Sequence, residues 1–307
     1  MHCSKKGEIG MARKTHKLQR ESKVCVVIMA ILTFLCLIPM IIVLSSSLTT
    51  ESSITEFGYS LFPKEFTLET YTFLLSNKVK TLLRALKNTM VVTALGMLFQ
   101  VTIDTLFAYA VTQKKEVFRF SRFLSIFAWF TTIFGGGVLP WYILCTRYYG
   151  LRNNLWALFI PYGFSVFNMY LIRGGFRSIP GEIIESAKID GASNSRIFLD
   201  IAIPLARGSI ITVLMFTFFS FWNDFYLPQW LTTTPDMMTL QRMLYTMLIN
   251  IGQILEGKGI QTGAQIVVPA LTSKLALTVL TILPLLIVYP FSLKYFVKGI
   301  NVGGVKA

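Results

Sequence analysis

The stretch VCVVIMAILTFLCLIPMIIVL, residues 24–44, contains 21 residues and no charged side chain. A helix of about 20 apolar residues crosses the ~30 Å hydrocarbon core of a bilayer. The apolar region of a secretory signal peptide is shorter, about 7–15 residues, so this stretch is interpreted as an uncleaved first span. Met11, in the basic segment before it, is a second candidate start. The sequence therefore predicts an integral membrane protein.

The composition of the whole chain supports the same class. Hydrophobic residues make up 53% of the 307 positions and charged residues only 14%, against about 25% charged residues in soluble domains. So few charges could not cover the surface of a soluble protein of this size. Apolar runs predict six spans, at 24–47, 86–113, 122–146, 153–173, 208–231 and 274–296. We expect an all-α integral membrane fold of six transmembrane helices.

Lys and Arg are unevenly distributed between the spans. With the N-terminus inside, the segments 1–23, 114–122, 173–207 and 294–307 hold 19 of the 29 basic residues. Basic segments are typically retained in the cytoplasm. We therefore expect both termini in the cytoplasm. The expected organisation is a cytoplasmic tail at 1–23 and a membrane domain at 24–307, with a cytoplasmic loop at 174–207 and an external insertion at 232–273.

Residues for catalysis or metal binding are scarce. The two histidines, His2 and His16, lie in the N-terminal tail, and the four cysteines are not clustered, so no metal spacing is visible. Residues 252–259 approach a phosphate-binding loop but end in Gly where the pattern needs Ser or Thr. This segment is interpreted as a flexible loop. We expect no catalytic, cofactor or metal residue, and the net charge of +14 indicates attraction to anionic lipid rather than nucleic acid.

One polar loop is too patterned to be a plain linker. It reads RGGFRSIPGEIIESAKIDGASNSRIFLDIAIPLARG, residues 173–208. Pro180 suits the first position of a helix, where a missing N–H costs nothing. Gly191 suits a left-handed helix end, and Ser193 or Asn194 could cap a second helix. The pattern predicts two short helices around a glycine turn that project from the membrane.

The same loop resembles a known motif. Glu185-Ser186-Ala187, three residues, Gly191, nine residues and Ile201-Ala202-Ile203-Pro204 resemble the EAA motif of ABC-importer permeases, with Ser186 in place of Ala and Ile203 in place of Leu. The resemblance implies a MetI/MalG-like type I importer fold whose loop docks into a cleft on an ATPase subunit. The residues that it places in ATPase coupling are Glu185, Ser186, Ala187, Gly191, Ile201 and Pro204.

The resemblance extends over nearly the whole chain. Asn88-Thr89, Trp222-Asn223-Asp224 and the tail KYFVKGINVGGVKA resemble carbohydrate permeases of the MalG-like family, within them the LplC-like subfamily for complex oligosaccharides. This implies a bacterial plasma-membrane heterodimer with a second permease, two ATPase subunits that carry ATP and Mg²⁺, and an extracytoplasmic solute-binding lipoprotein. An ABC permease for a non-sugar solute is an alternative. A stand-alone secondary transporter would be expected to show internal repeats or charged midplane sites.

A polar and aromatic group lies at the outer end of the fifth span. Its members, which could stack on and hydrogen-bond a sugar ring along a substrate path, are Trp222, Asn223, Asp224 and Tyr226. Aromatic residues at this depth also serve as interface anchors. Asp104, inside the second span, is interpreted as a partner in a helix-to-helix hydrogen bond rather than a substrate contact.

Two further segments have open interpretations. Apolar residues repeat every three to four positions over 239–256, which predicts an amphipathic helix. That helix either lies on the outer membrane surface or packs on the spans, or it docks the solute-binding protein. Gly135, Gly136 and Gly137, in the third span, predict close helix approach or a kink.

Overall fold

The computed structural model describes residues 4–77, 79–114, 116–255 and 270–303. Helices form almost all regular structure in these residues, and their one β interaction is an isolated bridge between Thr49 and Phe66. The all-α prediction is thus confirmed for the described chain. The chain divides into two compact units, residues 1–76 with 262–279 and residues 77–261 with 280–307.

The first unit begins with α1 (Ser4–Ser47), which contains the first predicted span. Its apolar side chains from Val24 to Leu44 are largely exposed, as expected for a helix surrounded by lipid. Two short helices follow, α2 (Glu51–Phe57) and α3 (Glu69–Asn77). The Thr50 side chain caps α2 by accepting a hydrogen bond from the backbone of Ser53.

The last helix, α14 (Ala270–Gly303), begins in the same unit. The Glu51 carboxylate accepts hydrogen bonds from the backbone nitrogens of Leu271 and Thr272, both at 2.9 Å. It also accepts one from the Thr272 hydroxyl at 2.8 Å. The first N–H groups of a helix have no partner within it, and a negative charge there is favourable. Glu51 therefore caps α14 from α2.

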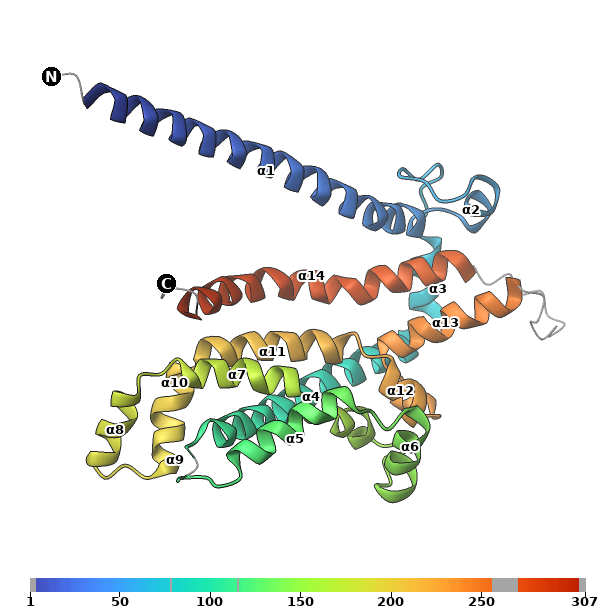
Figure 1. The fold of residues 1–307 in the computed structure, drawn as a ribbon. Helices are drawn as coiled ribbons and strands as arrows, with labels where there is room; N and C mark the ends of the chain where they lie inside the picture. Colours follow the sequence, from blue (N-terminus) through green and yellow to red (C-terminus); the bar gives the residue numbers. More distant parts are fainter. Residues whose placement is uncertain (1–3, 78, 115, 256–269, 304–307) are drawn as a thin grey trace. The chain divides into compact units, whose positions relative to one another are not determined.

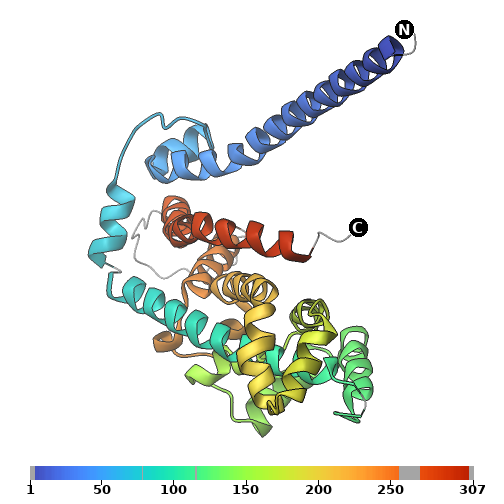
Figure 2. The ribbon, with the colours of Figure 1, turned by 90° about the vertical axis from the view of Figure 1, so that its left-hand side faces the viewer.

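The second unit contains the remaining elements. In chain order they are α4 (Val79–Thr112), α5 (Ser121–Ile133), α6 (Val138–Ile143), η1 (Leu144–Tyr148), η2 (Leu155–Leu158), η3 (Ile160–Tyr162), α7 (Val166–Arg177), α8 (Gly181–Ile189), α9 (Asn194–Arg196), η4 (Ile197–Ala202), α10 (Ile203–Leu205), α11 (Arg207–Trp222), α12 (Tyr226–Leu231), η5 (Pro235–Met237) and α13 (Leu240–Leu255). Helices α4, α7 and α11 pack on one another around a core that includes Ala108, Met169, Ile172 and Val213, with α5 alongside (Figures 1 and 2).

Three helices of the described chain are long and apolar enough to cross a membrane, namely Lys23–Ser47, Val79–Thr112 and Leu271–Pro290. Three more spans arise if bent pairs are each taken as one. These are Ser121–Ile133 with Val138–Tyr148, Leu155–Tyr162 with Val166–Arg177, and Asn194–Leu205 with Arg207–Trp222, bent by 116°, 57° and 76°. The structure thus allows up to six spans, but the third, fourth and fifth are not the uninterrupted helices that the apolar runs predict.

Each interruption has an identifiable cause. The third span bends where Gly137, at φ +83°, precedes α6, a conformation that favours glycine; the predicted kink is confirmed. The fourth span is interrupted before Ser165, whose side chain caps α7. The fifth helix ends at Trp222 rather than 231, because Asp224 accepts hydrogen bonds that start α12.

Candidate functional site

The predicted helical loop extends from the end of α7 beyond the packed group of helices, where α8 and α9 project (Figure 1). Pro180 is the N-cap of α8, one residue before the position predicted for it. Gly191 has φ +78° and follows the last turn. The Ala192 nitrogen donates to the Ala187 oxygen at 2.9 Å and closes the helix end. The predicted glycine turn is confirmed.

The second half of the loop is anchored in the core. Ser193, not Asn194, is the cap, since its hydroxyl accepts from the Arg196 backbone at 3.3 Å. The chain then winds as the π-helical segment η4, in which Ile197 and Ala202 are buried. The Phe198 ring packs 4.6 Å from the Tyr109 ring on α4. The returning half of the loop thus contacts α4 through Phe198 and α11 through α10.

Helix α8 has no buried residue. Ile183 is 40% exposed and Ile189 is 85% exposed, while Ile184 and Ala187 are half-buried. The Glu185 carboxylate lies 3.8 Å from the Lys114 ammonium, and both side chains are exposed. An exposed ion pair of this kind contributes only about 0–1 kcal/mol, so Glu185 can exchange Lys114 for another cation. The loop thus presents a carboxylate beside uncovered apolar side chains.

The motif residues occupy different positions on this loop. Glu185 and Ser186 are exposed on α8, Ala187 is half-buried, and Gly191 forms the turn. Ile201, in η4, is half-buried, and Pro204, in α10, is exposed. The structure gives the first four an accessible surface and places the last two at the base, where the loop returns to α11.

The group predicted for a substrate path is divided between structural roles. Trp222 is buried, and its Nε1 donates to the Thr281 oxygen at 3.3 Å. Both Asp224 oxygens accept backbone hydrogen bonds of α12, at 3.0 and 3.3 Å. Asn223 is exposed and accepts from Gln241 at 3.1 Å, while the half-buried Tyr226 ring lies 5.7 Å from Trp141. Trp222 is the one buried member of this group, Asn223 is exposed, and Asp224 and Tyr226 are half-buried.

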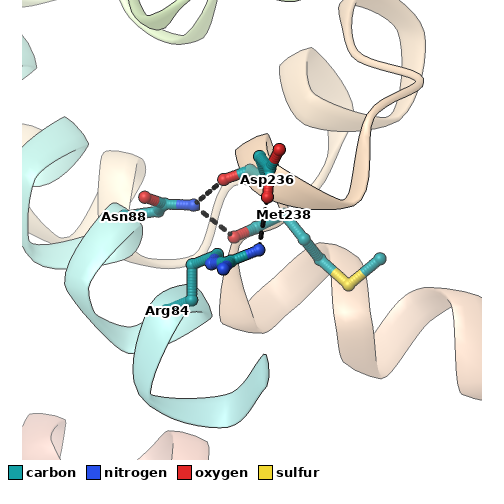
Figure 3. A network of polar contacts seen from close by, with 4 residues as sticks. All are labelled: Arg84, Asn88, Asp236 and Met238. Atoms are coloured by element: carbon teal, nitrogen blue, oxygen red, sulfur yellow. Dashed lines mark hydrogen bonds and ion pairs between the residues drawn. The ribbon is translucent and has the colours of Figure 1, made fainter. Parts of the chain in front are cut away.

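A polar network ties α4 to the segment before α13 (Figure 3). The Asn88 Nδ2 atom donates to the backbone oxygens of Asp236 and Met238 at 2.7 and 3.0 Å, and Arg84 pairs with the Asp236 carboxylate. Next to them, the buried Thr89 hydroxyl accepts from the Leu240 nitrogen at 3.0 Å. The sequence pointed to Asn88 and Thr89 only through a family resemblance. Their partners lie about 150 positions away along the chain, so no local sequence pattern indicates this network.

The predicted amphipathic helix is confirmed as α13. Leu240 is buried and Met243 is 5% exposed, because α13 packs against α4 and α12. Leu248 and Ile249 are exposed on the other side. The face of α13 that includes Met243 therefore packs within this chain. The face that includes Leu248 and Ile249 is the one that could dock a protein.

The expectation of a flexible loop at residues 252–259 is wrong for its first part. Residues 252–255 are the last four of α13, because the helical period of apolar residues continues through Leu255. Residues 256–259 lie outside the described residues. A helix therefore occupies the place where a phosphate-binding loop would need a preceding strand.

Asp104 connects two helices, as predicted. It is fully buried on α4, and its Oδ1 accepts from the Ser165 nitrogen, the N-cap of α7, at 2.8 Å. Asn168, in the first turn of α7, donates to the Thr217 hydroxyl on α11 at 3.3 Å. These contacts join α4, α7 and α11 at the break of the fourth span.

Replacement of Asp104 by leucine is expected to lower stability, because it leaves the Ser165 N–H without its acceptor in the protein interior. Such a loss costs about 1–3 kcal/mol. Thermal unfolding of the detergent-solubilised protein measures it. Asp104→Asn keeps an oxygen at the same position and is the matched control. An equal melting temperature for Asp104→Leu and Asp104→Asn would contradict the assigned contact.

An uncovered helical loop with exposed apolar side chains marks a surface for a protein partner. The chain belongs to the family of binding-protein-dependent transport system inner membrane components, whose characteristic sequence pattern covers residues 9–302. It is therefore a membrane-embedded permease subunit of an ABC importer and works with a binding protein and an ATPase. This family assignment replaces the alternative of a stand-alone secondary transporter.

Individual relatives support this assignment. Protein LplC of Bacillus subtilis is 32% identical over 88% of this chain and 89% of its own length. The polygalacturonan/rhamnogalacturonan transport system permease protein YtcP of Bacillus subtilis is 29% identical over 89% and 93%. A subunit in the crystal structure of a bacterial ABC transporter involved in the import of the acidic polysaccharide alginate superimposes with a TM-score of 0.75, at 26% identity over 91% and 97%. The predicted resemblance is confirmed.

Proposed function

We propose that this chain is a permease subunit for the import of carbohydrate, in particular complex oligosaccharides. The proposal is supported by the names of its relatives, which refer to polygalacturonan/rhamnogalacturonan and to alginate. Maltodextrin and galactooligosaccharide permeases of Bacillus subtilis are further relatives, at 27% and 33% identity over 71% and 51% of this chain. An importer of a non-sugar solute is the alternative that the uptake measurement below tests.

The proposed assembly lies in the plasma membrane of a bacterium. The chain pairs with a second, different permease, and two ATPase subunits carry ATP and Mg²⁺. An extracytoplasmic solute-binding lipoprotein delivers the substrate. The permease itself holds no cofactor and makes or breaks no bond.

The observation that carries the proposed ATPase contact is the uncovered helix α8, with Ile189 85% exposed and no buried residue. An exposed apolar surface beside a displaceable carboxylate suits a protein partner. We assign Glu185, Ser186, Ala187 and Gly191 to the ATPase contact. Ile201 and Pro204 position the returning half of the loop.

ATP-driven closure of the two ATPases would move α8 and α9 as one body. The anchor of Phe198 on Tyr109 would pass this movement to α4, and the short α10 would pass it to α11. The membrane domain then alternates between an outward-open and an inward-open state. The ATPases bias this two-state equilibrium by their different affinity for the two states.

The substrate path is assigned to the group of Trp222, Asn223, Asp224 and Tyr226. Asn223 and Tyr226 would make direct contacts, since an amide can hydrogen-bond hydroxyls and a tyrosine ring can stack on a sugar face. Trp222 and Asp224 would hold these two in position through their own contacts.

The function is tested by uptake into proteoliposomes that contain the chain purified together with its partners. We expect ATP-dependent accumulation of a labelled oligogalacturonide that requires the receptor protein. A labelled amino acid is the control. Accumulation of the amino acid in place of the oligosaccharide would contradict the substrate class but not the ATPase coupling.

Reporter fusions test the orientation. Fusions after Glu116 and after Asn194 are expected to report the cytoplasm, because basic segments are retained there. A fusion after Pro235, in the insertion, is expected to report the exterior. Alkaline phosphatase and green fluorescent protein activities measure the two sides. An exterior signal after Asn194 would reverse the topology and remove the proposed ATPase contact.

A further inference from the structure

A cavity lined by three arginines lies at the same end of the second unit as the helical loop. It has a volume of about 450 Å³, is open to the surface, and is lined by the C-terminal end of α4, the first turns of α5 and the last turns of α7. Among the described residues, its basic lining residues are Arg122, Arg173 and Arg177, and no acidic side chain lines it. Three positive charges at one cavity without a carboxylate favour an anionic ligand there.

The arginines keep donors available. Among the described residues, the ion pairs are those of Arg84, Lys114 and Arg196, and none includes an arginine of the cavity. Arg173 donates to the Ser125 hydroxyl at 2.7 Å, and its guanidinium lies 5.6 Å from the centre of the Tyr170 ring. Its Nε is buried and has no acceptor in the described chain.

Arg173 is thus held in one orientation with a donor unused. The side chains of Arg122 and Arg177 are exposed at the same cavity. Phosphate oxygens in the cavity would accept hydrogen bonds from these guanidinium groups, since planar guanidinium groups bind phosphate through parallel hydrogen bonds. The neutral hydroxyls of Thr112, Ser121 and Ser125 line the same cavity and supply further hydrogen bonds.

The cavity continues into an apolar surface. Ile126 lines it and is exposed, and Phe123 and Phe127 beside it on α5 are 63% and 53% exposed, with their rings stacked at 6.1 Å. In α5 the buried Ser121 and Ser125 line the cavity. At about 3.6 residues per turn, Ile126 lies around the helix between Ser125 and Phe123 and so joins the cavity to the aromatic surface. A ligand with an anionic head and apolar tails would match both parts.

We infer that the cavity of Arg122, Arg173 and Arg177 binds the phosphate headgroup of an anionic phospholipid, whose acyl chains lie along Phe123 and Phe127. Basic pockets between transmembrane helices near the cytoplasmic surface are suited to such headgroups. The assignment of this lipid to the cytoplasmic leaflet rests on the proposed topology. The cavity and its arginines are present whichever way the chain is oriented. A lipid there would lie next to Arg177, four residues before α8 begins.

The test titrates the purified importer complex in zwitterionic detergent with tail-labelled phosphatidylglycerol and follows fluorescence anisotropy. Arg122→Gln/Arg177→Gln removes the two exposed arginines and leaves Arg173 with Ser125. One arginine near an anionic lipid changes the dissociation constant roughly fivefold. Because the double variant removes two arginines, the affinity for the lipid should fall about 10- to 30-fold. The control is Arg147→Gln/Arg152→Gln, two exposed arginines outside the cavity, which should bind as the unmodified complex does.

The remaining outcomes each decide the proposal. Equal losses in both double variants would reduce the binding to general surface charge and overturn it. Inorganic phosphate that displaces the lipid at millimolar concentration, with weak binding of the intact lipid, would assign the cavity to a soluble anion. Unchanged lipid affinity with loss of the ATPase or second permease would make it a protein contact. Uptake of the oligogalacturonide is measured in parallel, so failure of the lipid site is separate from failure of the proposed function.

Discussion

Gly191→Val is expected to abolish most ATP-coupled uptake while the protein still inserts and folds. Gly191 has φ +78°, and a residue with a side chain costs about 1–2 kcal/mol in that conformation. A Cβ at this position would meet no atom within 4 Å, so the strain comes from the backbone alone. The exposed loop relieves it by leaving the left-handed conformation, and that turns α8 away from its partner.

The measurement is the rate of uptake in proteoliposomes, together with ATP hydrolysis by the same complex. We expect at least a tenfold lower ratio of transport to hydrolysis, or release of the ATPase. Gly191→Asn is the matched control, because asparagine tolerates positive φ far better than a β-branched residue. Normal coupled uptake by the valine variant would show that the position of α8 does not depend on this turn.

Glu185→Lys is expected to separate the ATPase from the membrane domain. The carboxylate offers a charge-assisted hydrogen bond worth about 1.5–3 kcal/mol, and the lysine replaces that attraction with repulsion. Lys114 lies 3.8 Å from the carboxylate, so the replacement also brings two ammonium groups together within this chain. Affinity purification through the permease should recover the ATPase in strongly reduced amount.

Glu182→Lys is the control for Glu185→Lys, since both residues are exposed on α8. A second control changes a charged residue in the loop that precedes α5. Arg119→Gln is used there rather than a change of Lys114, because Lys114 contacts Glu185. If Glu182→Lys and Glu185→Lys released the ATPase equally, the effect would belong to the charge of the loop rather than to one contact.

Much of the fold could be predicted because the relevant signals are local. The apolar run before Ser45 and the turn at Gly191 depend on neighbours in sequence, and both have the predicted form. The breaks in the fourth and fifth spans could not be predicted in the same way. The Ser165 nitrogen donates to the Asp104 carboxylate, 61 residues earlier. A contact between residues so far apart cannot be predicted from the local composition.

The candidate site was predictable to a similar extent. The EAA-like pattern located the helical loop, but the anchor of Phe198 on Tyr109 and the pair of Glu185 with Lys114 join distant segments. Trp222 and Asp224 illustrate the opposite case. Their side chains are typical of sugar contact, yet the structure uses them for a hydrogen bond to Thr281 and for the start of α12.

The Glu51 carboxylate precedes, along the chain, the helix that it caps. Its partner Leu271 follows 220 residues later, so the acceptor already exists when the translocon receives the final helix. Backbone N–H groups without an acceptor at the end of a helix disfavour its transfer into lipid. The Glu51 carboxylate accepts hydrogen bonds from these N–H groups. The beginning of the chain therefore fixes where the last span starts. A ribosome that stops before residue 270 leaves the first unit without its closing helix.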